Sequence, residues 1–356
     1  MESRLGFLLT FILVASVLCV PALDAESADS SQTPYLSQLD VNELLIYNSV
    51  SKATSVESAT KEFSVQFDSS RLFSDVATAE LYADGTVQNA LSAGYLSNPS
   101  VPYLWDYPVK HVDTKVSVKM VKIIDVDTGV ETTKYVVDSV AFSLTVPEGI
   151  TADSINELND AIKDIKVTGK TNADKVKSIM STLDSLTYEE DKEGEISNIY
   201  DALVKKKTTS AGVSQAFTKL CKDNDIPAII VAGDNLLAAK EAKNFWNYVY
   251  LEGDIEGETA YAWYLVDASY ANSVGIAGYL TEVTYDGKTY SMLSAHNVDL
   301  TLSAENVLTV PLLAKEKYVP VGGPTFLEMY GEQVMLGLLA VILVVAFVYA
   351  IRTGYV

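Results

Sequence analysis

Three short segments in the second half of the chain carry polar side chains of the kinds used in covalent catalysis. Ser210 opens Ser-Ala-Gly-Val-Ser-Gln-Ala-Phe, Asn244 opens Asn-Phe-Trp-Asn-Tyr-Val, and Asp267 closes Trp-Tyr-Leu-Val-Asp. A serine hydroxyl is a weak acid, so it becomes a nucleophile only when a base takes its proton. Asn244 is unable to be that base, because a neutral amide has no titratable proton acceptor near pH 7. The three segments therefore offer a hydroxyl and a carboxylate without a base between them.

In this order, the three segments resemble the motifs of the transglutaminase-like family. In that family a Cys opens a helix in a Cys-x-Gly-Tyr-Ser-like motif, a His precedes Ala-Trp-Asn at a strand start, and an Asp ends a later strand. The resemblance places Ser210 at the Cys position, Asn244 at the His position and Asp267 at the Asp position. It implies a papain-like core. Because two of the three catalytic groups are replaced, fold and activity must be judged separately.

We expect no ordinary transglutaminase or protease activity from such a site. Loss of the base costs a serine hydrolase on the order of a million-fold in turnover. Structural roles explain the polar groups that are present: Ser210 as a helix N-cap, and Asp267 as a hydrogen-bond partner of Asn244, Ser210 or nearby backbone. The former substrate groove would then bind a peptide, a cell-wall component or a partner protein. Its candidate wall residues are Trp246, Asn247 and Tyr248.

The chain has few other groups for chemistry. Its only histidines are His111 and His296, and its only cysteines are Cys19 and Cys221. We interpret His296 as a surface-loop residue, and as the base that an enzyme with Ser210 as nucleophile would have to use. Cys221 lies on the apolar stripe of its predicted helix, so we expect a buried and unreactive thiol. We expect no internal disulfide, no metal site and no cofactor.

The order of the predicted elements is that of an α+β protein. Residues 171–310 form the expected transglutaminase-like domain, with helices first and antiparallel strands after them. Residues 35–165 form an N-terminal mixed α/β accessory region, in which two alternating stretches at 114–124 and 134–146 predict a β-hairpin. The segment 63–165 loosely resembles the region before the catalytic core in some secreted bacterial and archaeal transglutaminase-like proteins.

Both ends of the chain predict an extracellular protein held at the cell membrane. Residues 1–25 contain an apolar run that ends in small residues, as in a secretory signal peptide, with a retained signal anchor as the alternative. A polar spacer follows at 26–34. Residues 334–351 are uninterruptedly apolar and long enough to cross the hydrocarbon core. We therefore expect a stalk at 311–333, a single transmembrane helix at 334–351 and a cytoplasmic tail at 352–356.

The charge of the chain excludes one class of partner. The formal net charge is -21, from 47 acidic and 26 basic residues. A surface of this sign repels nucleic acid. We therefore expect peptide, protein or cell-wall partners and contact with the membrane through the C-terminal helix.

Three functions remain open from the sequence. The first is a catalytically inactive, membrane-anchored binding module. The second is an acyl-transfer enzyme or peptidase of altered mechanism, with Ser210 as its nucleophile. The third is a structural surface protein whose groove is filled by its own side chains. Sequence alone does not separate the first from the third.

Overall fold

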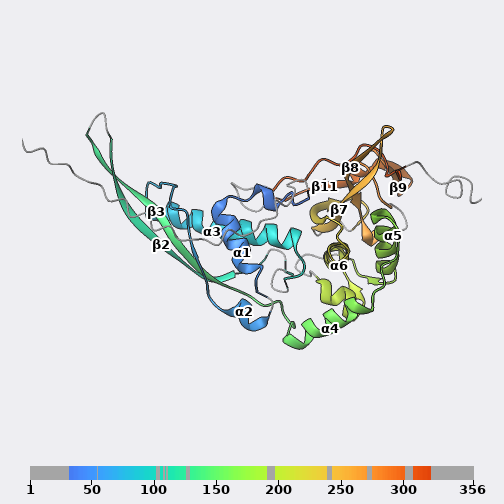
Figure 1. Cartoon of the computed structure of the whole chain (residues 1–356), viewed down its shortest axis with the longest axis horizontal. Helices are drawn as coiled ribbons and strands as arrows, with labels where there is room; N and C mark the ends of the chain where they lie inside the picture. The colour runs from blue at the N-terminus through green and yellow to red at the C-terminus, as the bar shows by residue number, and fades with distance from the viewer. Residues whose placement is uncertain are drawn as a thin grey trace, which may run out of the picture.

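The computed structural model describes residues 32–53, 55–101, 105–106, 109, 111–125, 129–190, 197–238, 243–270, 275–300 and 308–321. Within these residues an N-terminal unit and a core follow one another along the long axis of the molecule (Figure 1). The predicted signal peptide, transmembrane helix and cytoplasmic tail lie outside the described residues. No helix in the described part of the chain is long and apolar enough to cross a membrane.

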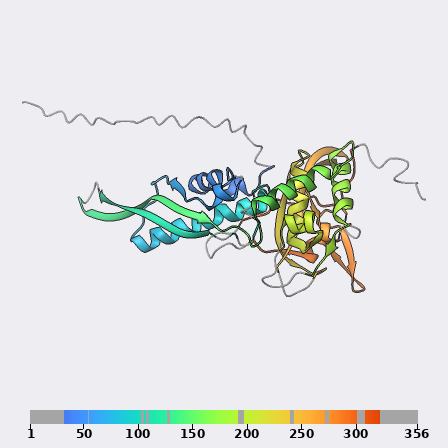
Figure 2. The same cartoon turned by 90° about the horizontal axis from the view of Figure 1, so that it is seen from below.

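The N-terminal unit packs helices against an antiparallel sheet. Its helices are α1 (Val41–Val50), α2 (Val56–Thr60) and α3 (Val76–Ser97), and its strands are β1 (Phe63–Gln66), β2 (His111–Ile124) and β3 (Glu131–Leu144). The sheet order is β1-β3-β2. Strands β2 and β3 confirm the predicted hairpin. They extend well beyond the body of the unit, and their outer ends at Ile124 and Glu131 lie away from the core (Figures 1 and 2).

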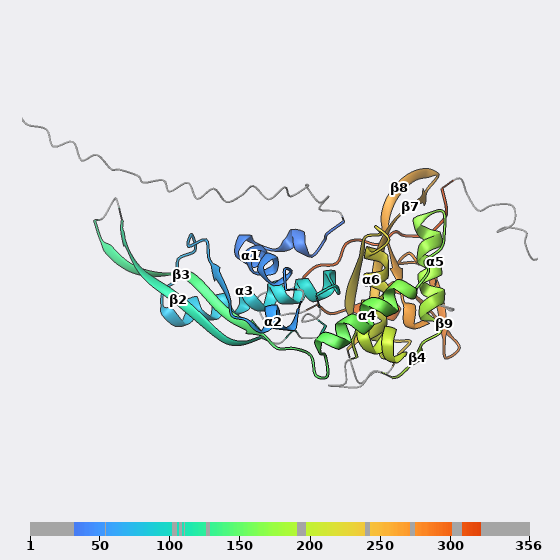
Figure 3. The ribbon, with the colours of Figure 1, turned by 60° about the horizontal axis from the view of Figure 1, so that its bottom comes forward.

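The core places helices on one face of a four-stranded sheet. The helices are α4 (Ala152–Asp164), α5 (Asn172–Leu183) and α6 (Ser210–Lys222), and the strands are β6 (Ala228–Asn235), β7 (Asn244–Ile255), β8 (Glu258–Val266) and β11 (His296–Val298). The sheet order is β11-β6-β7-β8, with antiparallel neighbours. Figure 3 shows α4, α5 and α6 gathered on the same side of the core. The mixed α+β class that we expected is confirmed.

Short elements connect these larger ones. They are η1 (Leu36–Gln38), β4 (Thr187–Tyr188), η3 (Asp201–Lys205), β5 (Lys207–Thr208), η4 (Ala268–Tyr270), β9 (Glu282–Tyr285), β10 (Lys288–Ser291) and α8 (Met292–Ala295). Strands β9 and β10 pair as an antiparallel hairpin.

The core sheet is covered on both faces. Phe217 and Cys221 of α6 are buried among residues of β7 and β8 on one side. On the other side, the ring of Tyr95 from α3 lies 6.0 Å from that of Phe245, and the Tyr35 hydroxyl donates to the Ile230 carbonyl at 2.9 Å. The strand ends of this sheet are therefore interior positions, so polar side chains placed there must find partners inside the protein.

The first part of the expected stalk is instead packed on the core. Residues 308–321, which we call the C-terminal strap, run beside β8. The Ala314 amide donates to the Trp263 carbonyl of the edge strand β8 at 2.7 Å, and the Asp254 amide of β7 donates to the Val319 carbonyl at 2.9 Å. A stalk that starts at residue 311 is therefore wrong. The strap pairs with the edge strand β8 at Trp263, and such an edge is a common site of unwanted pairing when it is left open.

Candidate functional site

Ser210 is the first residue of α6, and Thr209 occupies the N-cap position. The interpretation of Ser210 as the N-cap is therefore wrong by one residue. Its hydroxyl instead accepts a hydrogen bond from the Phe245 amide at 3.0 Å, and Ser210 is only 3% exposed. The serine thus ties the start of α6 to the start of β7.

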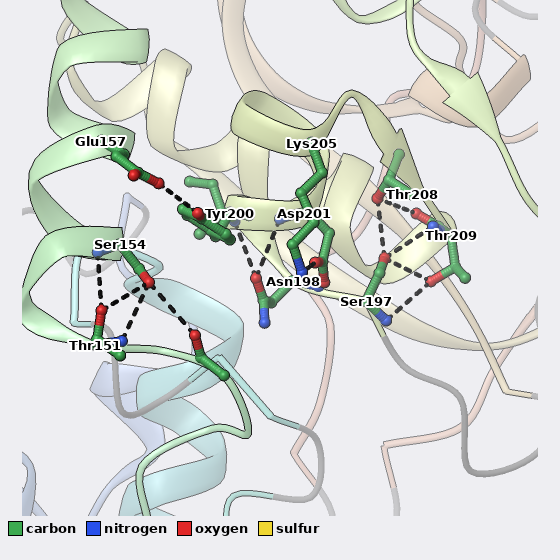
Figure 4. Close-up of polar contacts among 12 residues, drawn as sticks. Thr151, Ser154, Glu157, Ser197, Asn198, Tyr200, Asp201, Lys205, Thr208 and Thr209 are labelled. Carbon is green, nitrogen blue, oxygen red and sulfur yellow. Dashed lines mark hydrogen bonds and ion pairs between the residues drawn. The ribbon is translucent and has the colours of Figure 1, made fainter.

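The loop before α6 holds this helix start in place through a polar network (Figure 4). The Ser197 hydroxyl lies 2.9 Å from the hydroxyls of both Thr208 and Thr209, and it accepts from the Thr209 amide at 2.8 Å. Gly212 allows this close approach. A Cβ atom at Gly212 would lie 2.2 Å from Thr208 Oγ1 and 2.6 Å from the Asn198 carbonyl oxygen.

Asp267 follows β8 directly and is buried in a cluster with two other polar side chains. Its Oδ2 accepts from Asn235 Nδ2 at 2.9 Å and lies 3.1 Å from His296 Nε2. Its Oδ1 accepts from the Ser269 amide at 3.1 Å. Asp267 thus holds backbone, as we expected, but its side-chain partners are Asn235 and His296.

His296 is interior, so the prediction that it lies in a surface loop is wrong. It is 1% exposed, and it pairs with Asn235 across the β11–β6 ladder. Its Nδ1 lies 3.2 Å from the Met292 carbonyl oxygen. No motif or residue spacing in the chain pointed to this position, because His296 reaches Asp267 only through the pairing of β11 with β6.

The contacts of His296 engage both of its ring nitrogens. Nε2 faces the Asp267 carboxyl group and Nδ1 faces the Met292 carbonyl oxygen. These partners are groups other than Ser210. This arrangement differs from the one in which a histidine takes the proton of a serine nucleophile.

The three candidate groove residues do not line an open wall. Trp246 and Asn247 are 0% exposed, and Tyr248 is 2% exposed. The ring of Trp246 lies 5.0 Å from that of His296, in an edge-to-face arrangement. Burial raises the pKa of Tyr248 to about 12, so this side chain remains neutral at physiological pH. The expectation of an accessible wall at these residues is corrected.

Asn247 has a structural role of its own. Its Nδ2 lies within hydrogen-bonding distance of the Ser214 carbonyl (3.1 Å), the Thr218 hydroxyl (2.9 Å) and the Ile229 carbonyl (3.2 Å). These partners belong to α6 and β6. The asparagine on β7 therefore joins the helix that Ser210 begins to the neighbouring strand.

The remaining candidate residues are either buried within this cluster or lie outside it. Asn244 is the first residue of β7 and is 1% exposed. The prediction for Cys221 is confirmed: the residue is 0% exposed, and burial raises the pKa of its thiol. His111 lies in the N-terminal unit, where its Nε2 is 3.2 Å from Asp84. The structure therefore brings together Ser210, Asn244, Asp267 and the unexpected His296 within one sheet end.

Two surface pockets lie at other places in the fold. One, of about 370 Å³, is lined by residues that include Tyr47, Lys222 and Ile229. The other, of about 320 Å³, is lined by residues that include Lys177, Ile276 and Tyr318. Among the described residues there is no group of three or more His, Cys, Asp or Glu side chains that could hold a metal ion.

Comparison with known proteins agrees with this architecture. Residues 159–268 match the model of the transglutaminase-like superfamily. This part of the chain, which includes Ser210, Asn244 and Asp267, is therefore a transglutaminase-like domain. Comparison with curated protein sequences gives no match.

Solved structures similar to this chain include three with low sequence identity. One is described as a TGase: identity is 11%, the TM-score is 0.27, and the match covers 63% of this chain and 56% of that one. A candidate cysteine protease from Cytophaga hutchinsonii matches at 14% identity and a TM-score of 0.25, over 47% of this chain and 69% of that one. A candidate protease from Parabacteroides distasonis matches at 11% identity and a TM-score of 0.21, over 44% of this chain and 41% of that one. The chain thus spans little more than half of the first of these structures.

Proposed function

We propose that this chain is a transglutaminase-like protein that does not catalyse acyl transfer. The observation that carries the proposal is the engagement of His296. Its ring nitrogens face Asp267 and the Met292 carbonyl, while the position before Phe245 holds an amide in place of an imidazole. The imidazole therefore joins β11 to the residue that follows β8.

Burial gives the same cluster a structural role. Ser210, Asn244, Asp267 and His296 are all at most 3% exposed, and their hydrogen bonds join α6, β6, β7, β8 and β11. This supports the reading of a surface protein whose former groove is filled by its own side chains. A peptide or cell-wall ligand at Trp246, Asn247 and Tyr248 has no support from these contacts, so we propose that partners are bound at other surfaces.

We further propose that the protein acts outside the cell and is anchored by one helix. The support is in the sequence: an apolar run at residues 1–25 and a second one at 334–351. The described domain would then be the ectodomain. Protease protection of a C-terminal tag in intact cells, compared with a tag inserted after residue 129, tests this topology.

The absence of catalysis is tested by intact-mass labelling of the full-length protein with an activated acyl-transfer probe. We expect no labelling of the wild-type protein or of Ser210→Ala. We also expect Ser210→Cys to resist labelling until the protein is unfolded, because the position is 3% exposed. Native Cys221 is 0% exposed and provides an internal standard for a buried thiol.

Wild-type labelling that disappears in Ser210→Ala would establish a working nucleophile and overturn the proposal. Labelling of native Ser210→Cys alone would leave the wild-type protein inactive but would show an accessible groove. That result would instead support the first of the three functions inferred from the sequence, a ligand-binding module.

A further inference from the structure

The pocket of about 370 Å³ lies where the N-terminal unit meets the core, and we call it the inter-unit pocket. Tyr47 of α1 and Ser97 of α3 line it from the N-terminal unit, and Lys222 of α6 and Ile229 of β6 line it from the core. Ligand sites are often found at such junctions. The pocket is separate from the Ser210 cluster, because Ser210 and Lys222 are the two ends of a 13-residue helix, with about 18 Å of helix between them.

Lys222 brings to this pocket a positive charge that no carboxylate of the described residues neutralises in an ion pair. Its Nζ donates to Asn98 Oδ1, a neutral acceptor, at 2.7 Å. Lys219, one turn earlier on the same helix, is instead paired with Asp223. An ammonium group has three N–H donors, so Lys222 retains donors for a further acceptor.

The ammonium group of Lys222 is also partly removed from water. Lys222 is an exposed residue when all its atoms are counted, but burial is the largest cause that lowers the pKa of its amine. The charge of Lys219 acts in the same direction, and that of Asp223 opposes it. A negative charge beside a partly desolvated ammonium is attracted more strongly than it would be in bulk water.

Two hydroxyl groups beside Lys222 have hydrogens that no group of the described chain accepts. Ser97 Oγ is buried without a hydrogen-bond partner there. The Tyr47 hydroxyl accepts from Asn98 Nδ2 at 3.4 Å, and no acceptor within the same residues takes its own hydrogen. Burial raises the pKa of Tyr47, so its O–H stays protonated and able to donate. A buried hydroxyl without a partner costs stability, and a bound acceptor would remove that cost.

The amide of Asn98 holds two of these three donors close together. Its oxygen contacts the Lys222 ammonium and its nitrogen contacts the Tyr47 hydroxyl, while Ser97 is the preceding residue of the chain. The donors therefore come from α1, α3 and α6 but gather around one side chain. Such a group of donors fits a ligand that only accepts hydrogen bonds.

The rest of the lining is largely apolar. Leu36, Ile226, Pro227 and Ile229 contribute hydrocarbon surface. Asp225 adds a carboxylate to the lining, but it is exposed, so solvent and salt screen its repulsion of an anion. The pocket thus offers a cation and two hydroxyl donors beside an apolar wall.

We propose that the inter-unit pocket binds a small carboxylate with an apolar body. The carboxylate accepts hydrogen bonds from Lys222, Tyr47 and Ser97, and such bonds to an ionised acceptor are stronger than those between neutral groups. The apolar body packs against Leu36 and Ile226. A ligand in this position contacts both units at once. The proposal goes beyond the function proposed above and depends neither on the chemistry of Ser210 nor on membrane anchoring.

The test is a ¹⁹F NMR titration of 4-fluorophenylacetate with the full-length protein in an uncharged detergent, with detergent alone as the blank. We expect a dissociation constant of about 1 mM or below, as for an efficient ligand of this size. The neutral probe of the same shape is 4-fluorophenylacetamide. It should bind about tenfold more weakly, because it lacks the charge that Lys222 recognises.

The first pair of variants locates the charge. Lys222→Gln keeps a donor for Asn98 but removes the cation, and it should weaken carboxylate binding by about tenfold. The matched control is Lys177→Gln, because Lys177 lines the second pocket. This control removes the same charge from the chain and should bind the carboxylate as the wild type does.

Ser97→Ala separates a ligand contact from a structural one. The hydroxyl has no partner among the described residues, so its removal should leave the melting temperature unchanged or raise it. The same change should weaken carboxylate binding by about threefold or more, since one donor to the ligand is lost. A lower melting temperature with unchanged binding would contradict the assigned role.

Three results overturn the proposal. They are the absence of binding up to about 10 mM carboxylate, equal binding of the carboxylate and the amide, and a loss of binding in Lys177→Gln but not in Lys222→Gln. A tripeptide that ends in phenylalanine identifies the source of the carboxylate: tighter binding than that of 4-fluorophenylacetate assigns the pocket to peptide ends, and weaker binding assigns it to free acids. Labelling of Ser210 by an acyl probe would leave all these outcomes unchanged.

Discussion

His296 supplies a hydrogen-bonding partner for Asp267 in the interior of the core. A buried carboxyl group is costly unless it is hydrogen-bonded. Asn235 donates to Asp267 at 2.9 Å, and the imidazole adds a second contact at 3.1 Å. This second partner comes from β11, a strand beyond the residues that match the family model.

Removal of the imidazole should therefore destabilise the protein. We expect His296→Ala to lower the free energy of unfolding by about 1–3 kcal/mol, because it leaves a buried Asp267 oxygen without one of its hydrogen-bond partners. Urea unfolding followed by circular dichroism measures this change.

The matched control is His111→Gln. His111 also pairs with an aspartate, but Asp84 is 56% exposed at its side chain, so the loss should be about 1 kcal/mol or less. Equal losses in the two variants would argue against a buried structural contact at His296. The double variant His296→Ala with Asp267→Ala should lose less than the sum of the two single changes, because neither polar side chain is then left without the other.

The element that organises the site is the N-terminus of α6. Helix α6 is fixed by Ser210 to β7, by Asn247 to β6 and β7, and by Gly212 to the loop that precedes it. A further contact comes from Gln215, which is 0% exposed. Its side chain accepts from the Ile199 amide and donates to the Trp105 carbonyl. The helix is therefore held from the N-terminal unit as well as from the core.

The close approach at Gly212 gives a prediction for this element. Gly212→Ala should destabilise the protein by about 1–3 kcal/mol, because its Cβ would overlap the Thr208 hydroxyl and the Asn198 carbonyl. Gly85→Ala in α3 is the control. A Cβ at Gly85 meets nothing within 4 Å, so this change should stabilise the helix by about 0.5–1 kcal/mol. Thermal unfolding of both variants decides the point, and similar shifts of the same sign would refute the packing argument.

At the scale of the whole molecule, the strap is packed against both units, whereas the hairpin extends away from the core. The strap is joined to the core through β8 and to the N-terminal unit through Gln38, which bonds to Thr309 through both its amide nitrogen and its amide oxygen. The outer ends of β2 and β3, at Ile124 and Glu131, lie away from the core (Figures 1 and 2). If residues 334–351 cross the membrane, the strap is the last described part of the ectodomain before that segment.

Hydrogen exchange distinguishes a packed strap from a free stalk. We expect both amides to be protected, because the Ala314 amide donates from the strap to β8 at 2.7 Å and the Asp254 amide donates from β7 to the strap at 2.9 Å. A stalk with exposed backbone would exchange at these positions within seconds. Ala314→Pro removes one of the donors, and it should speed exchange at Asp254 if the strap is held as a unit.

Much of the local structure followed from patterns in the chain. Alternating residues predicted the β2–β3 hairpin, and the order of elements predicted helices before antiparallel strands in the core. Three short segments were enough to predict a transglutaminase-like domain, because each combines a polar residue with the element that carries it. Burial of Cys221 followed from its place on the apolar stripe of its helix.

Local sequence patterns were enough to predict the class of domain and to show that its three short segments hold a serine, an asparagine and an aspartate without a histidine. Only the packing of distant segments placed His296 in the interior, covered Trp246 and Tyr248, and held the strap on the core. These facts depend on contacts between segments far apart in the chain, such as β11 with β6 and residue 314 with residue 263. A periodic pattern reports which face of an element is buried, but it does not report which distant element covers that face.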